Sequence, residues 1–304
     1  MLPCTLCPRA CNIDRTVRPG RCGETAALRI ATHTLHFGEE PPISGTRGSG
    51  AFFFSGCPCH CFFCQNAQIS RPGGIGEPVP ADGFRAMALD LAARGAHNLN
   101  FVTPDHVWPH IAALCRRLRA EGFALPFVFN SSGYHAPALL DDAIPLMDVF
   151  LPDFKFADPA LASLVMGDAR YPDIALAALD RILAAKGFLE PFDSTGAETA
   201  RTGLLVRHLV LPGHVQNSLD ALSLLRARYG RFLPLSLMSQ YTPPPSLGSL
   251  PPPFDRTLLP DEYQAVVDRA LDLGFENLFV QPLADPAAPD PYTPDFSSPT
   301  PFPG

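Results

Sequence analysis

Residues 51–70 read AFFFSGCPCHCFFCQNAQIS, and this stretch decides the fold. An apolar run of the kind found in a buried strand leads directly into a loop with the spacing C-x3-C-x2-C, at Cys57, Cys61 and Cys64. Three thiolates on one short loop match three irons of a [4Fe–4S] cube and leave the fourth iron open to a substrate-like ligand. The stretch therefore predicts a strand followed by a loop that binds an incompletely ligated cluster.

Zinc is the alternative metal for this loop, with Cys59 as a fourth ligand. Paired zinc ligands are usually separated by about two to four residues, so the single-residue gaps on both sides of Cys59 would strain a tetrahedral site. We therefore interpret Cys59 as a bystander on the loop, or as an extra thiol that oxidises easily if it is exposed.

Apolar, β-rich runs recur along the chain and alternate with helical stretches. The runs are apolar on both faces, which is typical of parallel strands covered by crossover helices, in a doubly wound sheet or a β/α barrel. Polar residues such as Thr103 and Asp153 follow the runs, and in a parallel barrel such strand ends meet at one mouth. Six or seven strands are too few for a complete eight-stranded barrel, so we expect an α/β fold with an incomplete, laterally open (β/α)6-type barrel. The predicted strands are 51–55, 99–103, 126–130, 149–153, 204–209, 233–238 and 277–280, and the predicted helices are 81–94, 105–120, 172–185, 218–229 and 261–273.

Composition and charge narrow the classes of partner. The chain has 304 residues, 46% of them hydrophobic, and a net charge of −7 without any basic run, which argues against nucleic acid and anionic membrane surfaces as partners. Apolar segments approaching the roughly 18 residues of a membrane span are absent from the sequence. Nine cysteines without a secretory signal indicate metal ligation in a reducing compartment, so a cytoplasmic protein is expected.

The sequence divides into three predicted parts. Residues 1–48 form a small Cys-rich N-terminal extension, residues 49–282 the partial barrel, and residues 283–304 a Pro-rich tail that is expected to be extended or disordered.

The N-terminal extension carries a second group of four cysteines. They are separated by two, three and ten residues, and arginines surround them. Four thiolates without histidine suit structural zinc or a second iron–sulfur cluster, and the alternative is a set of free cysteines in a loop-rich extension. The group consists of Cys4, Cys7, Cys11 and Cys22.

Several segments together resemble the radical SAM superfamily, and within it the pyruvate formate-lyase activating enzyme-like (PflX-type) branch. The cluster spacing, Phe63 before the last cysteine, and the strand before the loop carry the resemblance to the superfamily. The resemblance covers roughly residues 1–282, although Pro58-Cys59 replaces the usual small polar pair. The segments that resemble the branch are CTLCPRACNIDR, GEEPPISGTRGSG, NLNFVTPDH, NSSGY, FLPDFKF, LLVRHLVLPGH and LSLMSQYTP.

The resemblance implies that S-adenosylmethionine (SAM) chelates the open iron through its amino and carboxylate groups. The methionine end would lie near the second strand, where Asn100 and Thr103 replace a glycine-rich acidic motif. Asn130 and Ser132 would bind the ribose or the amino acid, and ordinary turn chemistry is an equal alternative for this Asn-Ser-Ser-Gly segment.

Three charged residues near the strand ends are further candidates. Lys155 is one of two lysines against 21 arginines, and Asp153 two residues earlier points to the same side. Lys155 would supply a compact cation to a carboxylate and Asp153 would orient it or bind a hydroxyl, or the two form a solvated ion pair. Arg207 lies between Leu205 and Leu209 in a strand pattern, so an inward arginine that needs an anionic partner is expected.

As an activity, the resemblance implies a radical SAM oxidoreductase. Flavodoxin or ferredoxin would deliver an electron, SAM would yield a 5′-deoxyadenosyl radical, and the radical would take hydrogen from a glycine of a partner glycyl-radical enzyme. A radical SAM enzyme that modifies a small molecule or a peptide is one alternative. A non-catalytic iron–sulfur or zinc protein is another, but carriers normally saturate their irons with four ligands.

Overall fold

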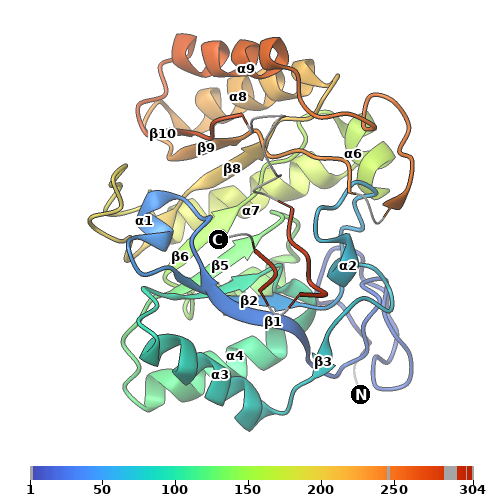
Figure 1. Ribbon diagram of the computed structural model, residues 1–304, viewed down its shortest axis with the longest axis vertical. Coiled ribbons are helices and arrows are strands. Elements are labelled where there is room, and N and C mark those ends of the chain that lie inside the picture. Colours follow the sequence, from blue (N-terminus) through green and yellow to red (C-terminus); the bar gives the residue numbers. More distant parts are fainter. Residues whose placement is uncertain (1–2, 245–246, 284–292, 299, 303–304) are drawn as a thin grey trace.

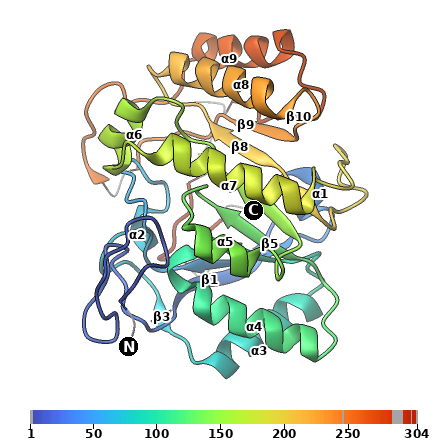
Figure 2. The ribbon, with the colours of Figure 1, turned by 180° about the vertical axis from the view of Figure 1, so that it is seen from behind.

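The computed structural model describes residues 3–244, 247–283, 293–298 and 300–302. An arc of mostly parallel strands forms its centre, and helices cover the outer face of this arc (Figures 1 and 2). The strands are β1 (Arg29–His36), β2 (Ser49–Phe54), β3 (Glu77–Pro78), β4 (Leu99–Val102), β5 (Phe127–Ser131), β6 (Val149–Pro152), β7 (Gly203–Leu204), β8 (Val206–Leu209), β9 (Leu235–Met238) and β10 (Leu278–Val280). The helices are α1 (Pro41–Ser44), α2 (Ala67–Ser70), α3 (Ala81–Ala93), the 3-10 turn η1 (Asp105–Val107), α4 (Trp108–Ala120), α5 (Pro137–Ala143), α6 (Pro159–Met166), α7 (Tyr171–Lys186), α8 (Val215–Tyr229) and α9 (Pro260–Asp272).

The strand order confirms the predicted α/β class and the partial parallel barrel. One sheet has the order β3-β1-β2-β4-β5-β6-β7, and a second has the order β10-β9-β8. A parallel bridge between Asp153 and Arg207 joins β6 to β8, so the two sheets form one continuous arc. Every pairing from β2 onward is parallel, and among the described residues the outer strands β3 and β10 do not pair with each other.

Each of the seven predicted apolar runs contains a strand, and in all of these strands except β10 both faces are largely buried. In β5, Phe127 and Phe129 pack in the large core between the sheet and the helices, whereas Val128 packs on the inner side with Val149 and Leu151. Alternate side chains of β2 divide in the same way, with Phe52 toward the helices and Phe53 toward the inside of the arc. The period-2 geometry of a strand therefore lines the concave face with the even-numbered residues of β5.

The N-terminal part contributes to the sheet in a way that the sequence did not predict. β1 pairs antiparallel with β2 over most of its length, and β3 pairs antiparallel with β1. β1 reads RIATHTLH and is half-buried along most of its length, so it lacks the continuous apolar run by which the other strands were found. The division of the chain at residues 48 and 282 stays a prediction.

The described part of the Pro-rich tail packs against the inside of the arc. Phe296 is 5% exposed and belongs to the same apolar cluster as Phe53, and Phe302 borders this cluster. The tail crosses the concave face seen in Figure 1, while α5 and α7 lie on the opposite face seen in Figure 2. The disorder expected for the tail stays a prediction for residues 284–292, 299, 303 and 304, which lie outside the described residues. Across the described part of the chain, none of the helices is both long and apolar enough to cross a membrane.

Candidate active site

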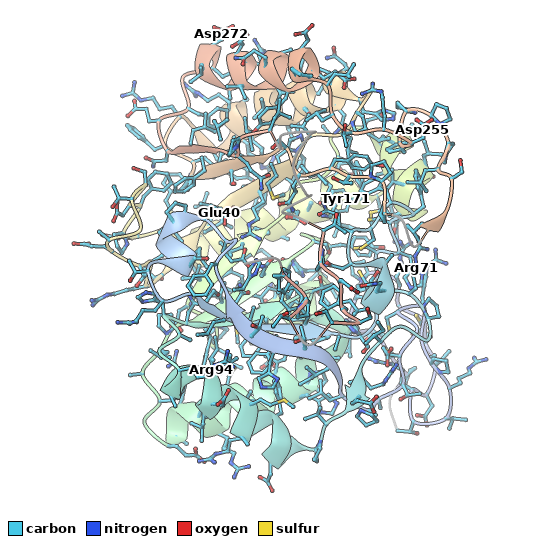
Figure 3. All side chains as sticks on the ribbon, viewed as in Figure 1. Glu40, Arg71, Arg94, Tyr171, Asp255 and Asp272 are labelled. Atoms are coloured by element: carbon cyan, nitrogen blue, oxygen red, sulfur yellow. The ribbon has the colours of Figure 1, made fainter. Side chains whose placement is uncertain are left out.

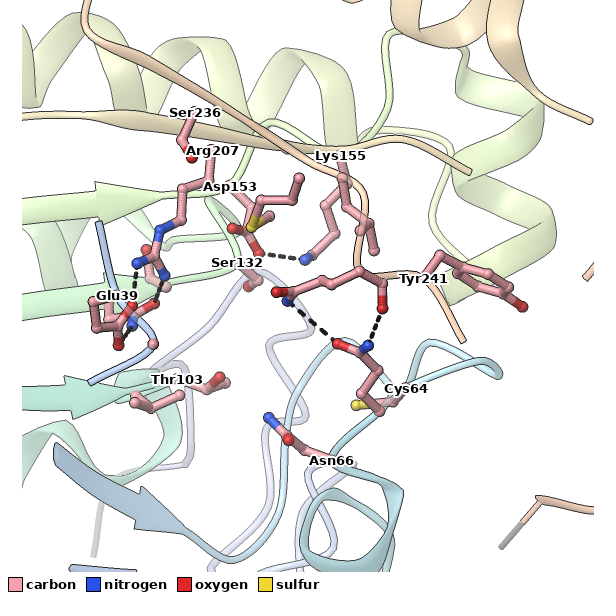
Figure 4. A pocket seen from close by; sticks show the side chains of 18 of the residues that line it. Glu39, Cys64, Asn66, Thr103, Ser132, Asp153, Lys155, Arg207, Ser236 and Tyr241 are labelled. Atoms are coloured by element: carbon pink, nitrogen blue, oxygen red, sulfur yellow. Dashed lines mark hydrogen bonds and ion pairs between the residues drawn. The ribbon is translucent and has the colours of Figure 1, made fainter. Parts of the chain in front are cut away.

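A cavity of about 520 Å³ opens at the carboxyl ends of the parallel strands, a size that is ordinary for small-molecule sites (Figure 4). It lies inside the arc and is lined by residues of the cysteine loop 56–64, which we call the cluster loop, by the strand ends and by the tail. Among the residues labelled in Figure 3, Glu40 lines the cavity. All but one of the predicted barrel-site residues line it. These are Cys57, Cys61, Cys64, Phe63, Thr103, Asn130, Ser132, Asp153, Lys155 and Arg207. Their roles stay predictions.

The cluster loop begins at a glycine that no other residue can replace. Gly56 has φ of +83°, and a Cβ there would lie 2.5 Å from Cγ of Glu24 and 2.6 Å from the carbonyl oxygen of Cys22. Directly after this turn, the Cys57 N–H donates to the carbonyl of Cys22 at 3.2 Å. The glycine thus lets the cluster loop lie directly on the N-terminal extension.

Arginines hold the outer side of the cluster loop. Arg71 donates to the carbonyls of Cys61 at 3.3 Å and of Phe62 at 3.0 Å. Arg9 donates to the carbonyls of Pro58 and Cys59 on the other half of the loop. These guanidinium groups fix the backbone that carries the thiols and place positive charge beside a group that would be anionic when it holds metal.

The thiols of the loop face the cavity with perturbed pKa values. Burial raises the pKa of Cys61 to about 12 and also raises the pKa of Cys64. A hydrogen bond with the Cys59 side chain lowers the pKa of Cys57 to about 7. Cys59 is itself buried, and its thiol donates to Oγ of Ser132 at 3.1 Å, so it is not the exposed thiol that the sequence left open. Soft thiol donors on one loop, aimed into one cavity, fit an iron–sulfur cluster.

Neither cysteine group forms a site for a single metal ion within the described ranges. In the residues that the structure describes, no three Cys, His, Asp or Glu side chains converge on one ion. The metal of either cysteine group stays a prediction.

Asp153 and Lys155 form an ion pair at the end of β6 (Figure 4). Their side chains are 17% and 20% exposed, so the pair is largely removed from water and is not the solvated surface pair considered above. Burial alone would lower the pKa of Lys155, but the carboxylate of Asp153 and the nearby thiol of Cys61 raise it above its ordinary value. Lys155 therefore stays charged beside the cluster loop.

Tyr171 of α7 positions this ion pair, and the sequence analysis missed it. Its hydroxyl accepts from the Lys155 N–H at 2.9 Å and lies 2.9 Å from the carbonyl oxygens of both Ser132 and Asp153. The ring is fully buried, so the hydroxyl joins the loop after β5 to the loop after β6. A buried tyrosine at a helix start gives no signal in sequence beyond ordinary core packing.

Arg207 points inward as predicted, and two carboxylates of the protein meet it (Figure 4). Its Nε donates to Glu40 at 3.0 Å, and it forms ion pairs with both Glu40 and Glu39. Its Nη1 donates to Oδ1 of Asn130 at 3.2 Å. Burial alone would raise the pKa of Glu39, but the charge of Arg207 lowers it below its ordinary value. We call Glu39, Glu40, Asn130 and Arg207 the inner brace.

Asn100 is the one predicted barrel-site residue that does not line the cavity. It is fully buried, and its Nδ2 donates to Oε1 of Glu39 at 2.8 Å. Its Oδ1 has no hydrogen-bond partner, which leaves an unsatisfied buried acceptor behind the brace. Thr103, at the end of the same strand, has φ of +53°, which is rare for a β-branched residue and marks stored backbone strain at this wall of the cavity.

A chain of glutamines crosses the mouth of the cavity, and the sequence analysis also missed it. Gln65, directly after the last cysteine, bonds to the carbonyl and the side chain of Gln240 after β9. Gln281 after β10 donates to Oε1 of Gln240 at 3.1 Å. These amides tie the cluster loop to the ends of β9 and β10, at the opposite end of the arc from β3.

The N-terminal cysteines form a compact loop beside the cluster loop. Cys7 and Cys22 are buried, whereas Cys4 and Cys11 are half-buried, and all four are free thiols. Burial raises the pKa of Cys7 to about 12. The backbone closes through the N–H of Cys4 to the carbonyl of Ile13 at 2.9 Å. The four cysteines thus belong to one small loop-rich unit, and in the described residues their thiols do not converge on a single ion.

Arg9 fastens this unit to the barrel. Its guanidinium donates to the carbonyls of Pro58 and Cys59 in the cluster loop and to those of Met166 and Gly167 at the end of α6. The side chain is 7% exposed. One buried arginine therefore satisfies four carbonyls from two separate segments.

Replacing Arg9 by methionine is expected to lower the free energy of unfolding by about 1–3 kcal/mol, because it leaves several carbonyls without a donor. Anaerobic urea unfolding followed by circular dichroism measures this change. Arg18→Met in the same extension is the control, since Arg18 is exposed and a surface change there should stay within about 0.5 kcal/mol. Equal losses in the two variants would contradict a clamp at Arg9.

Comparison with known proteins places few limits on the activity. No protein-family model matches the chain. The uncharacterized protein MJ0674 of Methanocaldococcus jannaschii is 25% identical over 218 residues, which cover 70% of this chain and 58% of that protein. The chain therefore aligns with little more than half of this curated relative.

Similar solved structures are distant. The structure of Streptococcus suis SuiB bound to precursor peptide SuiA has a TM-score of 0.45 at 8% identity and covers 74% of this chain and 46% of that chain. Native anSMEcpe with bound AdoMet has a TM-score of 0.46 at 10% identity and covers 79% of this chain and 62% of that chain. Scores this low leave the functional conclusion to the residues of this chain.

Proposed function

We propose that the protein is a radical SAM enzyme. The observation that supports this most strongly is the convergence of the C-x3-C-x2-C loop and the buried ion pair on one cavity at the carboxyl ends of parallel strands. When a [4Fe–4S] cluster and SAM are bound, they supply reductive cleavage of a carbon–sulfur bond, which gives methionine and a 5′-deoxyadenosyl radical.

The side chains of the cavity suit the binding of a charged, hydroxyl-rich cofactor. Cys57, Cys61 and Cys64 are the proposed cluster ligands. Lys155 is the proposed cation for a carboxylate, and Asp153 holds its ammonium in place. Arg207 already has carboxylate partners, so its proposed role in cofactor binding is to hold Asn130 in position.

Further side chains would complete the binding of SAM. Thr103 and Ser132 offer hydroxyls at the strand ends. Asn100 does not line the cavity, so its proposed role is indirect: it holds Glu39 of the inner brace in place. Phe63 stacks on Phe254 with ring centroids 5.6 Å apart, which covers the cluster loop with apolar surface and excludes water.

The proposed substrate is a glycine in a partner glycyl-radical enzyme, from which hydrogen is removed. The open edge between β3 and β10 supports this proposal because a polypeptide loop needs lateral access to the cavity. Flavodoxin or ferredoxin is the proposed electron donor. A cytoplasmic location suits this chemistry, since nine free thiols persist in a reducing compartment. A small molecule or a peptide is the alternative substrate.

Production of 5′-deoxyadenosine tests the proposal. The anaerobically reconstituted and reduced protein should convert SAM to 5′-deoxyadenosine and methionine in equal amounts, measured by liquid chromatography. A Cys115→Ala variant is the control and should behave like wild type, because Cys115 is buried in α4 away from the cavity lining. A protein with an intact cluster that forms no 5′-deoxyadenosine would instead be a non-catalytic iron–sulfur protein.

A further inference from the structure

The tail rests on a defined surface of the barrel, which we call the tail subsite: His36, Phe53, Gln68 and Ile69. The ring of Phe302 lies 4.3 Å from His36 and 5.0 Å from Phe53, measured between ring centroids. The tail is therefore held at β1, β2 and α2, next to the cluster loop (Figures 1 and 3).

Two kinds of contact hold the tail, and both are typical of peptide recognition. The side chain of Gln68 accepts from the backbone N–H of Phe296 at 2.7 Å and donates to Oδ1 of Asp295 at 3.2 Å. The ring of Phe296 lies 5.5 Å from that of Phe53 and is buried in the cluster that includes Ile69. The bond to the backbone gives general affinity for a peptide, and the aromatic pocket gives specificity.

The tail segment itself has little regular structure. Residues 293–295 have no regular structure, and the chain then turns back on itself: the Ser298 N–H donates to the carbonyl of Asp295 at 3.0 Å, and the Asp295 N–H donates to the carbonyl of Pro301 at 2.8 Å. The contacts described above, hydrogen bonds to Gln68 and aromatic contacts with Phe53, attach it to the barrel. Among the described residues it does not pair with a strand. This is how a bound peptide sits on a surface.

The tail subsite borders the cavity that holds the cysteines. Pro294 and Phe302 line the same cavity as Cys57, Cys61 and Cys64. A polypeptide that reached the cavity across the inside of the arc would have to take the position of these two residues.

We propose that the tail subsite is a binding site for a polypeptide substrate, and that the tail residues 293–298 and 300–302 occupy this site and compete with the substrate for it. The ligand chemistry is a short turn-forming segment in which an acidic residue directly precedes an aromatic one, as Asp295 precedes Phe296. The inference deepens the proposed function, on which it rests for the identity of the substrate as a polypeptide. It assigns the aromatic anchor of that substrate to Phe53 and its backbone contact to Gln68.

Competition between the tail and an added peptide tests the proposal on the full-length chain. A fluorescent peptide TPDFSSPTPF, the sequence of residues 293–302, is titrated against wild type and against the Phe296→Ala/Phe302→Ala variant, with anisotropy as the readout. The variant should bind the peptide at least about tenfold more tightly, because its binding-competent fraction is no longer depleted by its own tail. Phe232→Ala is the matched control, since it removes an exposed aromatic ring elsewhere and should bind like wild type.

Two further measurements complete the test. A peptide with alanine at both aromatic positions should bind neither protein, and Gln68→Ala added to the variant should weaken binding of the normal peptide about tenfold, as expected for an anchor contact. A variant that is folded by circular dichroism and binds no peptide would overturn the proposal, as would equal affinity of wild type and variant. Binding requires neither cluster nor SAM, so a failure here is distinct from a failure to form 5′-deoxyadenosine.

Discussion

The Cys57→Ala/Cys61→Ala/Cys64→Ala variant is expected to form 5′-deoxyadenosine at less than about a thousandth of the wild-type rate. The cofactor carries the difficult chemistry, and removal of all three thiols leaves the cavity without a ligand for it. Liquid chromatography of the anaerobic reaction measures the nucleoside, and iron and sulfide analysis measures the cluster. Retention of wild-type turnover by the variant would contradict the assignment of the loop.

The same variant identifies the metal of the N-terminal group. If Cys4, Cys7, Cys11 and Cys22 hold a second cube, about four irons per chain should remain in the variant. If they hold structural zinc, metal analysis should find about one zinc per chain and almost no iron. A variant that retains neither metal would show that the N-terminal cysteines are free.

Replacing Arg207 by methionine is expected to lower the free energy of unfolding by about 3–5 kcal/mol, the usual cost of removing one partner from a buried ion pair. Arg207 is 8% exposed, and its loss leaves Glu39 and Glu40 buried without a cation. Urea unfolding at neutral pH measures the change. Arg228→Met is the matched control, because the Arg228–Asp180 pair is about half exposed and should cost about 0–1 kcal/mol.

The effect of Arg207→Met should depend on pH in a defined direction. The pKa of Glu39 is lowered in the folded protein, so its contribution to stability is present above the ordinary glutamate pKa of about 4.3 and is lost as the pH falls below it. In the variant, burial without the cation should raise this pKa. The deficit relative to wild type should therefore be full at neutral pH and shrink in acid, and a deficit that does not change with pH would argue against the brace.

The sequence was sufficient for the parallel strands because their signal is local. The predicted run 126–130, for example, is apolar on both faces up to its last residue, and the polar residues at and after its end, Asn130 and Ser132, line the cavity. β1 was not predicted because it has no continuous apolar run: polar residues such as Thr32 and Thr34 interrupt it, and the strand is half-buried. It lies near the edge of the barrel, where it pairs antiparallel with β2. The burial of β1 depends on its pairing with β2, and the sequence of β1 alone does not show this pairing.

The candidate site was predictable where its residues sit near one another in the chain. Cys57, Cys61 and Cys64 share a loop, and Asp153 and Lys155 are two residues apart, so their spacing alone brings them together. The partners of Arg207 could not be found in this way, since Glu40 lies 167 positions earlier. The burial of Phe296 and the contacts of Phe302 could not be predicted for another reason. Prolines dominate the composition of the tail around them, and this composition is typical of an extended or disordered segment.

The inner brace has a consequence for the order in which the chain folds during synthesis. Its carboxylates at Glu39 and Glu40 emerge from the ribosome long before Arg207 does, and a carboxylate without its cation stays in contact with water. We therefore expect the inner face of the first strands to stay hydrated until Arg207 has been made. The inside of the barrel loses its water only when the second half of the polypeptide, with Arg207, has been made.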